Sequence, residues 1–200
     1  MAGKAVFVIK SKVKEVAKVA TIYGFSLKGI KTFKGREGEG CQGDIYYDGK
    51  KVGWYSDNAD GGMADIDFYG EIEQRKRMSD LLKAATVKYY AQYPLTGEFS
   101  SLEPNEEMFM SELVGFTEHE KEFKKYQKDG YIAMAVFRKP GDDLYEYTQL
   151  FKRKAAIEEF QKRTDIEQAR IYTKDAFVIA DEQPLITQGE GEETTPNMGM

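Results

Sequence analysis

The sequence is poor in residues on which many enzymes and secreted proteins depend. Among its 200 residues it has one cysteine, one histidine and one tryptophan. A single cysteine, Cys41, excludes an intramolecular disulfide and fits a reducing compartment. No run approaches the roughly 18 consecutive apolar residues of a membrane span. The apolar run Ala5–Ile9 is also too short for the core of a signal peptide. We therefore expect a cytoplasmic protein with no membrane partner.

Neither the histidine nor the cysteine is placed as a catalytic residue usually is. His119 stands among Glu118, Glu120 and Glu122, and no serine or cysteine is marked out as a nucleophile that it could activate. We expect an exposed surface histidine. Acidic neighbours disfavour the thiolate form of Cys41, which makes it a poor nucleophile. We therefore predict no catalytic residue and a protein that is not an enzyme.

Charge is unevenly distributed along the chain. Residues 1–36 carry nine basic residues and one acidic residue, and residues 37–122 carry eight basic and nineteen acidic residues. Surface charges are mostly solvated, so the basic arm could simply pack beside the acidic middle. Alternatively, two opposed patches could steer a charged partner. If the arm binds nucleic acid, the phosphate contacts would come from Lys12, Lys14 and Lys18.

The order of apolar patterns predicts an α+β fold. Residues 1–70 read as a glycine-rich antiparallel sheet with one helix. Residues 71–180 read as a central helical block followed by a C-terminal ββαβ unit, either as a second domain or as a continuation of the first. Residues 181–200 hold five acidic residues and no aromatic one, which predicts a disordered tail.

Helix boundaries are marked by proline and by capping residues. A helix beginning at Glu71 should end before Pro94. Pro104 suits the first turn of a second helix, which Gly115 should interrupt. Thr117 and Glu120 have the spacing of a capping box, so we expect a third helix to begin there.

The stretch from Phe33 to Phe68 holds eight of the nineteen glycines. Asp48-Gly49 between two strand-like runs is a strong hairpin signal. Residues 38–43 match the G-x-G-x-x-G pattern of dinucleotide-binding loops, but that motif must precede a helix and here a strand follows. We interpret these glycines as permitting a sharp turn or a bulge between strands.

Two sets of side chains in and beside this stretch are candidate sites. Four aspartates offer oxygen ligands for a divalent metal, although they miss the spacing of a calcium-binding EF-hand loop and also suit turns: Asp57, Asp60, Asp65 and Asp67. Four aromatic residues and two glutamates could form a contact surface, although such aromatics most often pack within a sheet: Tyr46, Tyr47, Trp54, Tyr55, Glu71 and Glu73.

Part of this stretch resembles proteins of phages and bacterial mobile elements. The elements are Phe33-x-Gly35-Arg36-Glu37-Gly38, then Asp48-Gly49-Lys50-Lys51-Val52-Gly53, then Asp57-x-x-x-Gly61-Gly62. They cover about thirty residues and resemble a segment of small proteins, some of them encoded near anti-defence genes. The resemblance implies an accessory or inhibitory protein of a bacterial cell, such as an anti-CRISPR-like binder of a host nuclease. It carries over no catalytic residue.

These observations lead to one expected function and two alternatives. We expect a non-enzymatic binding protein without a cofactor, which acts on a bacterial protein or nucleoprotein, such as a CRISPR effector. The first alternative is a metal-dependent hydrolase or nuclease that uses the four aspartates. The second is a nucleic-acid-binding protein that uses the basic arm.

Overall fold

The computed structural model of the chain describes residues 5–8, 19–95, 97–139, 146–166, 168–173 and 177–180. Its helices are α1 (Ile72–Gln92), the 3-10 helix η1 (Gly97–Ser101), α2 (Glu106–Lys128) and α3 (Lys154–Gln161). Its strands are β1 (Ala5–Val8), β2 (Thr21–Ile22), β3 (Phe25–Lys34), β4 (Glu39–Tyr47), β5 (Lys50–Asp57), β6 (Asp65–Phe68), β7 (Ala133–Arg138), β8 (Tyr147–Phe151), β9 (Gln168–Thr173) and β10 (Val178–Ile179). The fold is α+β, as the sequence predicts.

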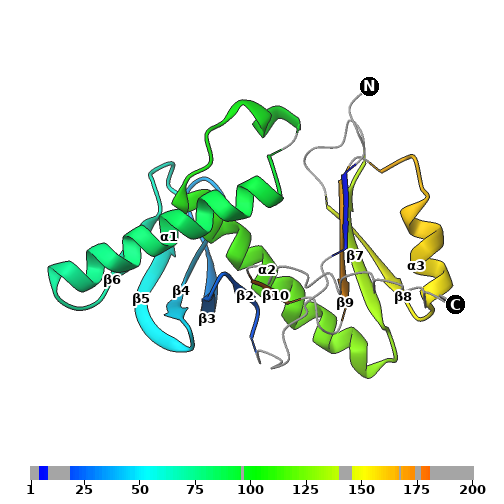
Figure 1. Cartoon of the computed structure of the whole chain (residues 1–200), viewed down its shortest axis with the longest axis horizontal. Coiled ribbons are helices and arrows are strands. Elements are labelled where there is room, and N and C mark those ends of the chain that lie inside the picture. The colour runs from blue at the N-terminus through cyan, green and yellow to red at the C-terminus, as the bar shows by residue number, and fades with distance from the viewer. Residues whose placement is uncertain are drawn as a thin grey trace, which may run out of the picture.

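The strands form two sheets at opposite ends of the molecule, with α2 running between them (Figure 1). A six-stranded sheet has the order β10-β2-β3-β4-β5-β6 and is antiparallel except where β10 meets β2. A four-stranded sheet has the order β1-β9-β7-β8 and is antiparallel except where β1 meets β9. Each sheet thus receives one strand from the other side of residue 70, where the sequence suggests a boundary.

The β4–β5 hairpin forms at the predicted place. Asp48 and Gly49 have φ values of 47° and 77°, which is the left-handed pair that a two-residue type I′ turn requires. Of the sharp turn or bulge expected from the glycines at residues 38–43, the turn lies just before β4, where the Gly35 amide donates to the Gly38 carbonyl at 2.8 Å. The predicted bulge does occur here, since the pairing of β3 with β4 shifts between Lys28 and Lys31, opposite Gly43.

Helix α1 follows the predicted boundaries, whereas α2 does not. The Asn105 side chain caps α2 by accepting a hydrogen bond of 2.9 Å from the Met108 amide. The helix then runs without a break to Lys128, so the prediction of an interruption at Gly115 and a new start at Thr117 is wrong. Thr117 does not cap a helix, because its hydroxyl donates to the Leu113 carbonyl one turn earlier.

Helix α2 contacts both sheets and therefore organises the core. On one side Phe109 packs edge-to-face on Phe25 of β3, with ring centroids 6.2 Å apart. On the other side Phe116 packs on Tyr172 of β9 at 5.9 Å. A helix that is apolar on two sides is buried between layers. This position places α2 between the two sheets.

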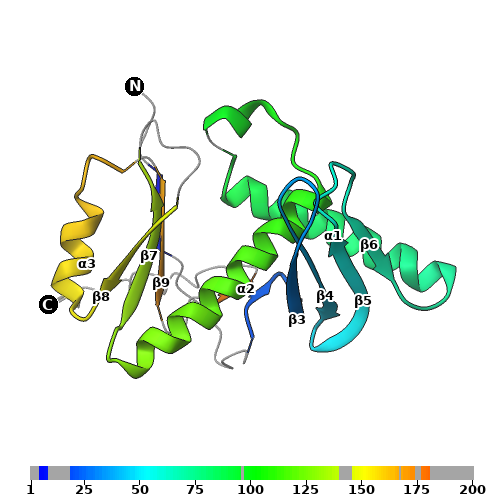
Figure 2. The ribbon, with the colours of Figure 1, turned by 180° about the vertical axis from the view of Figure 1, so that it is seen from behind.

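Helix α3 covers the far face of the four-stranded sheet (Figure 2). Its Phe160 packs against Phe137 of β7 and Phe151 of β8, each with ring centroids 5.3 Å apart. The order β7-β8-α3-β9 is the ββαβ unit that the sequence predicts. With α2 on one face and α3 on the other, β7 is buried along almost its whole length.

Some predictions fall on residues outside the described ranges. They are the lysines Lys12, Lys14 and Lys18, the tail at residues 181–200, and residues 11–18 of the N-terminal helix, which we expect to run from Ser11 to Gly24. The predicted end of that helix is wrong, because Thr21–Ile22 form strand β2. Within the described ranges, no helix has both the length and the apolar character needed to cross a membrane.

Candidate binding cleft

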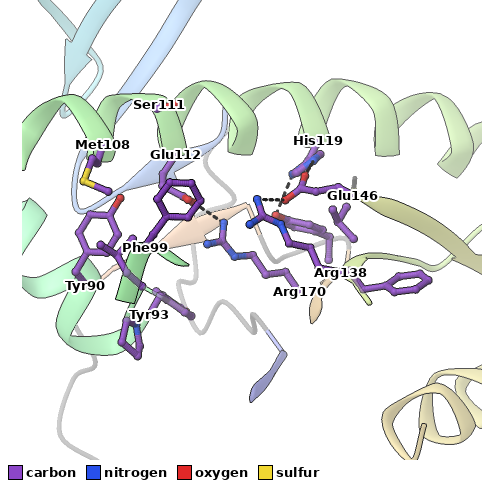
Figure 3. A pocket seen from close by; sticks show the side chains of 15 residues that line it. Tyr90, Tyr93, Phe99, Met108, Ser111, Glu112, His119, Arg138, Glu146 and Arg170 are labelled. Carbon is purple, nitrogen blue, oxygen red and sulfur yellow. Dashed lines mark hydrogen bonds and ion pairs between the residues drawn. The ribbon is translucent and has the colours of Figure 1, made fainter. Parts of the chain in front are cut away.

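A cleft with a volume of about 290 Å³ lies between the C-terminal end of α1, helix α2 and the inner face of the four-stranded sheet (Figure 3). Helix α2 lines it along one face, because Met108, Glu112 and His119 recur at helical spacing. Strands β7 and β9 supply residues from the opposite wall, among them Arg138 and Arg170. The cleft thus combines side chains from α1, η1, α2, β7 and β9.

One part of the cleft is apolar and aromatic. This wall comes from the end of α1, the segment that follows it and the start of α2: Tyr90, Tyr93, Pro94, Leu95, Phe99 and Met108. Tyr90 and Tyr93 are largely buried, whereas Phe99 is 41% exposed. Aromatic and thioether side chains suit contact with a planar or aliphatic group.

A tight ion pair joins α2 to β9 inside the cleft. The Arg170 guanidinium donates to Glu112 Oε2 at 2.5 Å, and the Tyr89 hydroxyl donates to the same oxygen at 2.8 Å. Burial alone would raise the pKa of Glu112, but the charge and hydrogen bonds of Arg170 and Tyr89 lower it below its usual value. Glu112 is therefore ionised near neutral pH, and its charge compensates Arg170.

A second, looser ion pair lies nearby. Arg138 Nη2 is 3.4 Å from Glu146 Oε1, and the two side chains are 36% and 49% exposed. In the pairing of β7 with β9, Val136 lies opposite Arg170 and Arg138 lies opposite Gln168. Arg138 and Arg170 are therefore diagonal neighbours on one face of the sheet. Two guanidinium groups thus enter the same cleft, and only one of them is tightly paired.

His119 lies in the cleft rather than on the surface, so the expectation of an exposed histidine is wrong. Its side chain is 20% exposed, and its Nδ1 lies 3.0 Å from the Tyr172 hydroxyl. Burial is the main cause that lowers the pKa of His119. Arg170 lowers this pKa further, whereas Glu146, Glu122 and Glu112 act in the opposite direction. Burial also raises the pKa of Tyr172 to about 12. Near neutral pH, this pair is therefore uncharged.

The predicted aromatic surface divides between the two faces of the six-stranded sheet. Tyr46 and Trp54 lie on the open face, where both are partly exposed. Tyr55 is 2% exposed and belongs to the core. Tyr47 packs on Phe25, with ring centroids 4.8 Å apart. The structure therefore leaves only Tyr46 and Trp54 of the four aromatics available to a partner on that face.

The four aspartates have individual roles in turns and at the sheet edge. Asp57 accepts from the Ala59 amide at 2.8 Å, and Asp60 accepts from the Gly62 amide at 3.0 Å. Asp67 accepts from the Trp54 indole at 3.3 Å. Asp65 is exposed on the same strand, β6. In the described part of the chain, no three His, Cys, Asp or Glu residues are grouped so that they could hold a metal ion.

Comparisons add no relative to this picture. No family model, curated protein or solved structure matches the chain. Function is therefore inferred from the chemistry of the cleft and of the surface.

Proposed function

We propose that the protein is a non-enzymatic binding protein whose cleft takes an anionic group attached to an aromatic or aliphatic one. The observation that supports this function is the position of Arg138, a loosely paired cation that shares a cleft with an apolar wall. A ligand with both features would place its apolar part against Tyr90, Phe99 and Met108 and its anion on Arg138.

Arg138 is the better anion site of the two arginines. Arg170 already has a partner at 2.5 Å that is itself held by Tyr89. Separating a desolvated pair is costly. The pair of Arg138 with Glu146 is longer and more exposed, and exposed pairs contribute little. An incoming carboxylate or phosphate can therefore replace Glu146 and form a bidentate contact with the guanidinium.

The protonation states in the cleft favour holding a ligand over reacting with it. The raised pKa of Tyr172 keeps its hydroxyl protonated. Glu112 is engaged with Arg170 and Tyr89, so it is a poor acceptor for a further proton. Cys41 does not line this cleft, and burial with the nearby Asp57 raises the pKa of its thiol. These features support binding by fixed hydrogen bonds rather than nucleophilic catalysis.

The anionic and apolar groups that the cleft would bind could belong to a small molecule or to an acidic segment of a partner protein. The resemblance of residues 33–62 to proteins of phages and mobile elements favours a protein source. On that basis we propose a bacterial protein or nucleoprotein as the partner, with a defence nuclease such as a CRISPR effector as the first candidate. The metal-dependent and nucleic-acid-binding alternatives have no observation of the described residues in their favour.

The small-molecule source is tested by thermal unfolding in the presence of three probes. Indole-3-acetate carries both an anion and a ring, indole carries only the ring, and acetate carries only the anion. A ligand that binds only the folded state raises the melting temperature. We expect indole-3-acetate to raise it most, Arg138→Gln to abolish the effect, and Arg77→Gln to retain it, because Arg77 is an exposed arginine of α1 outside the cleft.

The protein source is tested with the same variants immobilised and exposed to a bacterial lysate. A partner that uses the cleft should be retained by the unmodified protein and by Arg77→Gln, but not by Arg138→Gln. Cleft binding is contradicted if no probe raises the melting temperature and no protein shows this pattern. It is also contradicted if Arg138→Gln binds as well as Arg77→Gln in both experiments.

A further inference from the structure

The six-stranded sheet ends in a strand with an open edge. Strand β6 is the last in its sheet and pairs with β5 on one side (Figure 2). The Tyr69 amide donates to the Val52 carbonyl at 2.8 Å. Successive residues of a strand direct their backbone N–H and C=O groups to opposite sides. Asp65 and Asp67 therefore direct these groups toward β5, as Tyr69 does, whereas Ile66 and Phe68 direct them to the open edge. These outward groups can template an added strand.

A groove runs along this edge. It has a volume of about 680 Å³ and lies between β6, the first half of α1 and the start of α2. Ile66, Phe68 and Leu82 line it with apolar groups. Met63 and Ile72, also in the lining, are 84% and 74% exposed. Large apolar side chains exposed beside open backbone groups are typical of a docking surface.

The charges around the groove differ between its two sides. Asp65 and Asp67 point to the outer face of the sheet, because they alternate with Ile66 and Phe68. On the side toward the helices, the groove is lined by Arg75 and Lys76 of α1 and by Glu106 and Glu107 at the start of α2. A strand added to β6 would therefore have its outward side chains beside carboxylates, and its inward side chains beside apolar groups and charges of both signs. Basic residues suit its outward positions, and apolar residues suit its inward positions.

We propose that the β6 edge binds an extended segment of a partner protein in which basic and apolar residues alternate. The segment would add a seventh strand to the sheet through the backbone groups of Ile66 and Phe68. Its basic side chains would pair with Asp65 and Asp67, and its apolar side chains would fill the groove. This surface is separate from the cleft and uses a partner of opposite charge.

The charge at the edge argues against a second copy of the chain as the occupant. In a two-fold antiparallel pairing of β6 with itself, facing side chains must lie on the same face of the sheet. Asp65 would then face Asp67 of the second copy, or Asp67 would face its own equivalent. Like charges directly opposite each other destabilise a strand pair, and charged residues protect edges in this way.

A peptide of alternating lysine and valine, with capped termini, tests the proposal directly. Trp54 is the only tryptophan, and its indole donates to Asp67. Peptide binding should therefore change the tryptophan fluorescence. It should also slow hydrogen exchange at the amides of Ile66 and Phe68, but not at those of Asp65 and Asp67, which already face β5. A peptide with the same composition but with its lysines grouped at one end should bind less well.

Two variants and one control decide the outcome. Replacing Asp65 and Asp67 by Asn should weaken binding by about three- to tenfold, because exposed charge pairs make modest contributions. The control, Glu158→Gln with Glu159→Gln, removes two exposed acids of α3 that do not line the groove and should leave affinity unchanged. Ile66→Pro removes an outward N–H and should prevent binding without removing a bond to β5.

The proposal is overturned if the alternating peptide does not bind, or if it binds no better than the grouped one. Equal affinity for the Asn double variant and the Gln double variant would also overturn it. So would a concentration-dependent dimer that Ile66→Pro dissociates, since the edge would then serve a second copy of this chain. If Ile66→Pro does not fold, the Asn double variant and the exchange pattern still decide.

Discussion

Two arginine–glutamate pairs face the same cleft and differ in almost every physical respect. Arg170 and Glu112 are 2.5 Å apart with side chains 21% and 29% exposed, whereas Arg138 and Glu146 are 3.4 Å apart with side chains 36% and 49% exposed. The Glu112 carboxylate also accepts a hydrogen bond of 2.8 Å from the Tyr89 hydroxyl, whereas the third group beside the Glu146 carboxylate is the His119 ring at 4.0 Å. Burial and hydrogen bonding therefore make the pair of Arg170 with Glu112 a structural one, whereas Arg138 can exchange Glu146 for another anion.

The difference follows from where each glutamate is anchored. Glu112 lies in the middle of α2, so its position relative to β9 is fixed by the packing of the helix against the sheet. Glu146 lies just before β8, outside any regular element, and its partner is the last residue of β7. Interactions between rigid elements keep their geometry, whereas interactions at element ends rearrange easily. Each prediction below tests this contrast.

The largest expected effect comes from Glu112→Ala. This change leaves Arg170 as an uncompensated, mostly buried cation between α2 and β9. We expect the free energy of unfolding to fall by about 2–3 kcal/mol, measured by urea denaturation. A double variant, Glu112→Leu with Arg170→Leu, should lie much closer to the unmodified protein, because it removes both charges together. A double variant less stable than Glu112→Ala would contradict the assignment of the loss to an unpaired charge.

A smaller effect is expected for Tyr89→Phe. The change removes the hydroxyl that donates to Glu112 Oε2 at 2.8 Å, but keeps the ring in its aromatic cluster. The loss of stability should be about 1 kcal/mol, as for a typical buried hydrogen bond. Tyr126→Phe is the matched control, because its hydroxyl donates to Glu122 at 2.9 Å and its side chain is only half-buried, whereas Tyr89 is 2% exposed. A larger effect from the control would mean that burial does not decide the strength of these bonds.

The pH dependence of stability tests the uncharged state of His119. Because its pKa is lowered in the folded protein, the unfolded chain binds more protons than the folded one below about pH 6.5. Stability should therefore fall as the pH drops below that value, toward the folded pKa. His119→Gln should remove this slope between pH 5 and 7. As the chain has no other histidine, an unchanged slope would show that another group titrates. Besides burial, the charged groups that set the shift are Glu146, Arg170, Glu122 and Glu112, and the Tyr172 hydroxyl lies within hydrogen-bond distance of the ring.

The sequence predicts much of the fold, because most elements carry local signals. Asp48-Gly49 specifies its hairpin, and Pro94 marks the region where α1 ends. The failures arise where tertiary packing overrides a local signal. Gly115 and Thr117 suggest a break, yet α2 is held straight by apolar contacts to a sheet on each side. A capping motif is informative only where the chain is free to begin a helix.

The cleft could not be predicted in the same way. Its two arginines are 32 positions apart in the numbering, and Glu112 and Arg170 are 58 apart. No periodic pattern joins residues at such separations. Arg170 also lies between Ala169 and Ile171 inside strand β9, and a basic residue between apolar ones in a strand is the one local signal that could have indicated a buried partner. The crowded aspartates, by contrast, are conspicuous in the sequence, yet two of them hold turns and the other two lie on strand β6.

The smallest expected effect is that of Glu146→Gln on stability. The pair with Arg138 is long and exposed, so its loss should change the free energy of unfolding by no more than about 0.5 kcal/mol. Binding of an anion should nevertheless improve, because Glu146 competes with it for Arg138. Affinity for indole-3-acetate, measured by calorimetry, should therefore rise while stability stays the same. A large loss of stability would place this pair in the same class as Glu112 and Arg170, and the cleft would then lack an exchangeable cation.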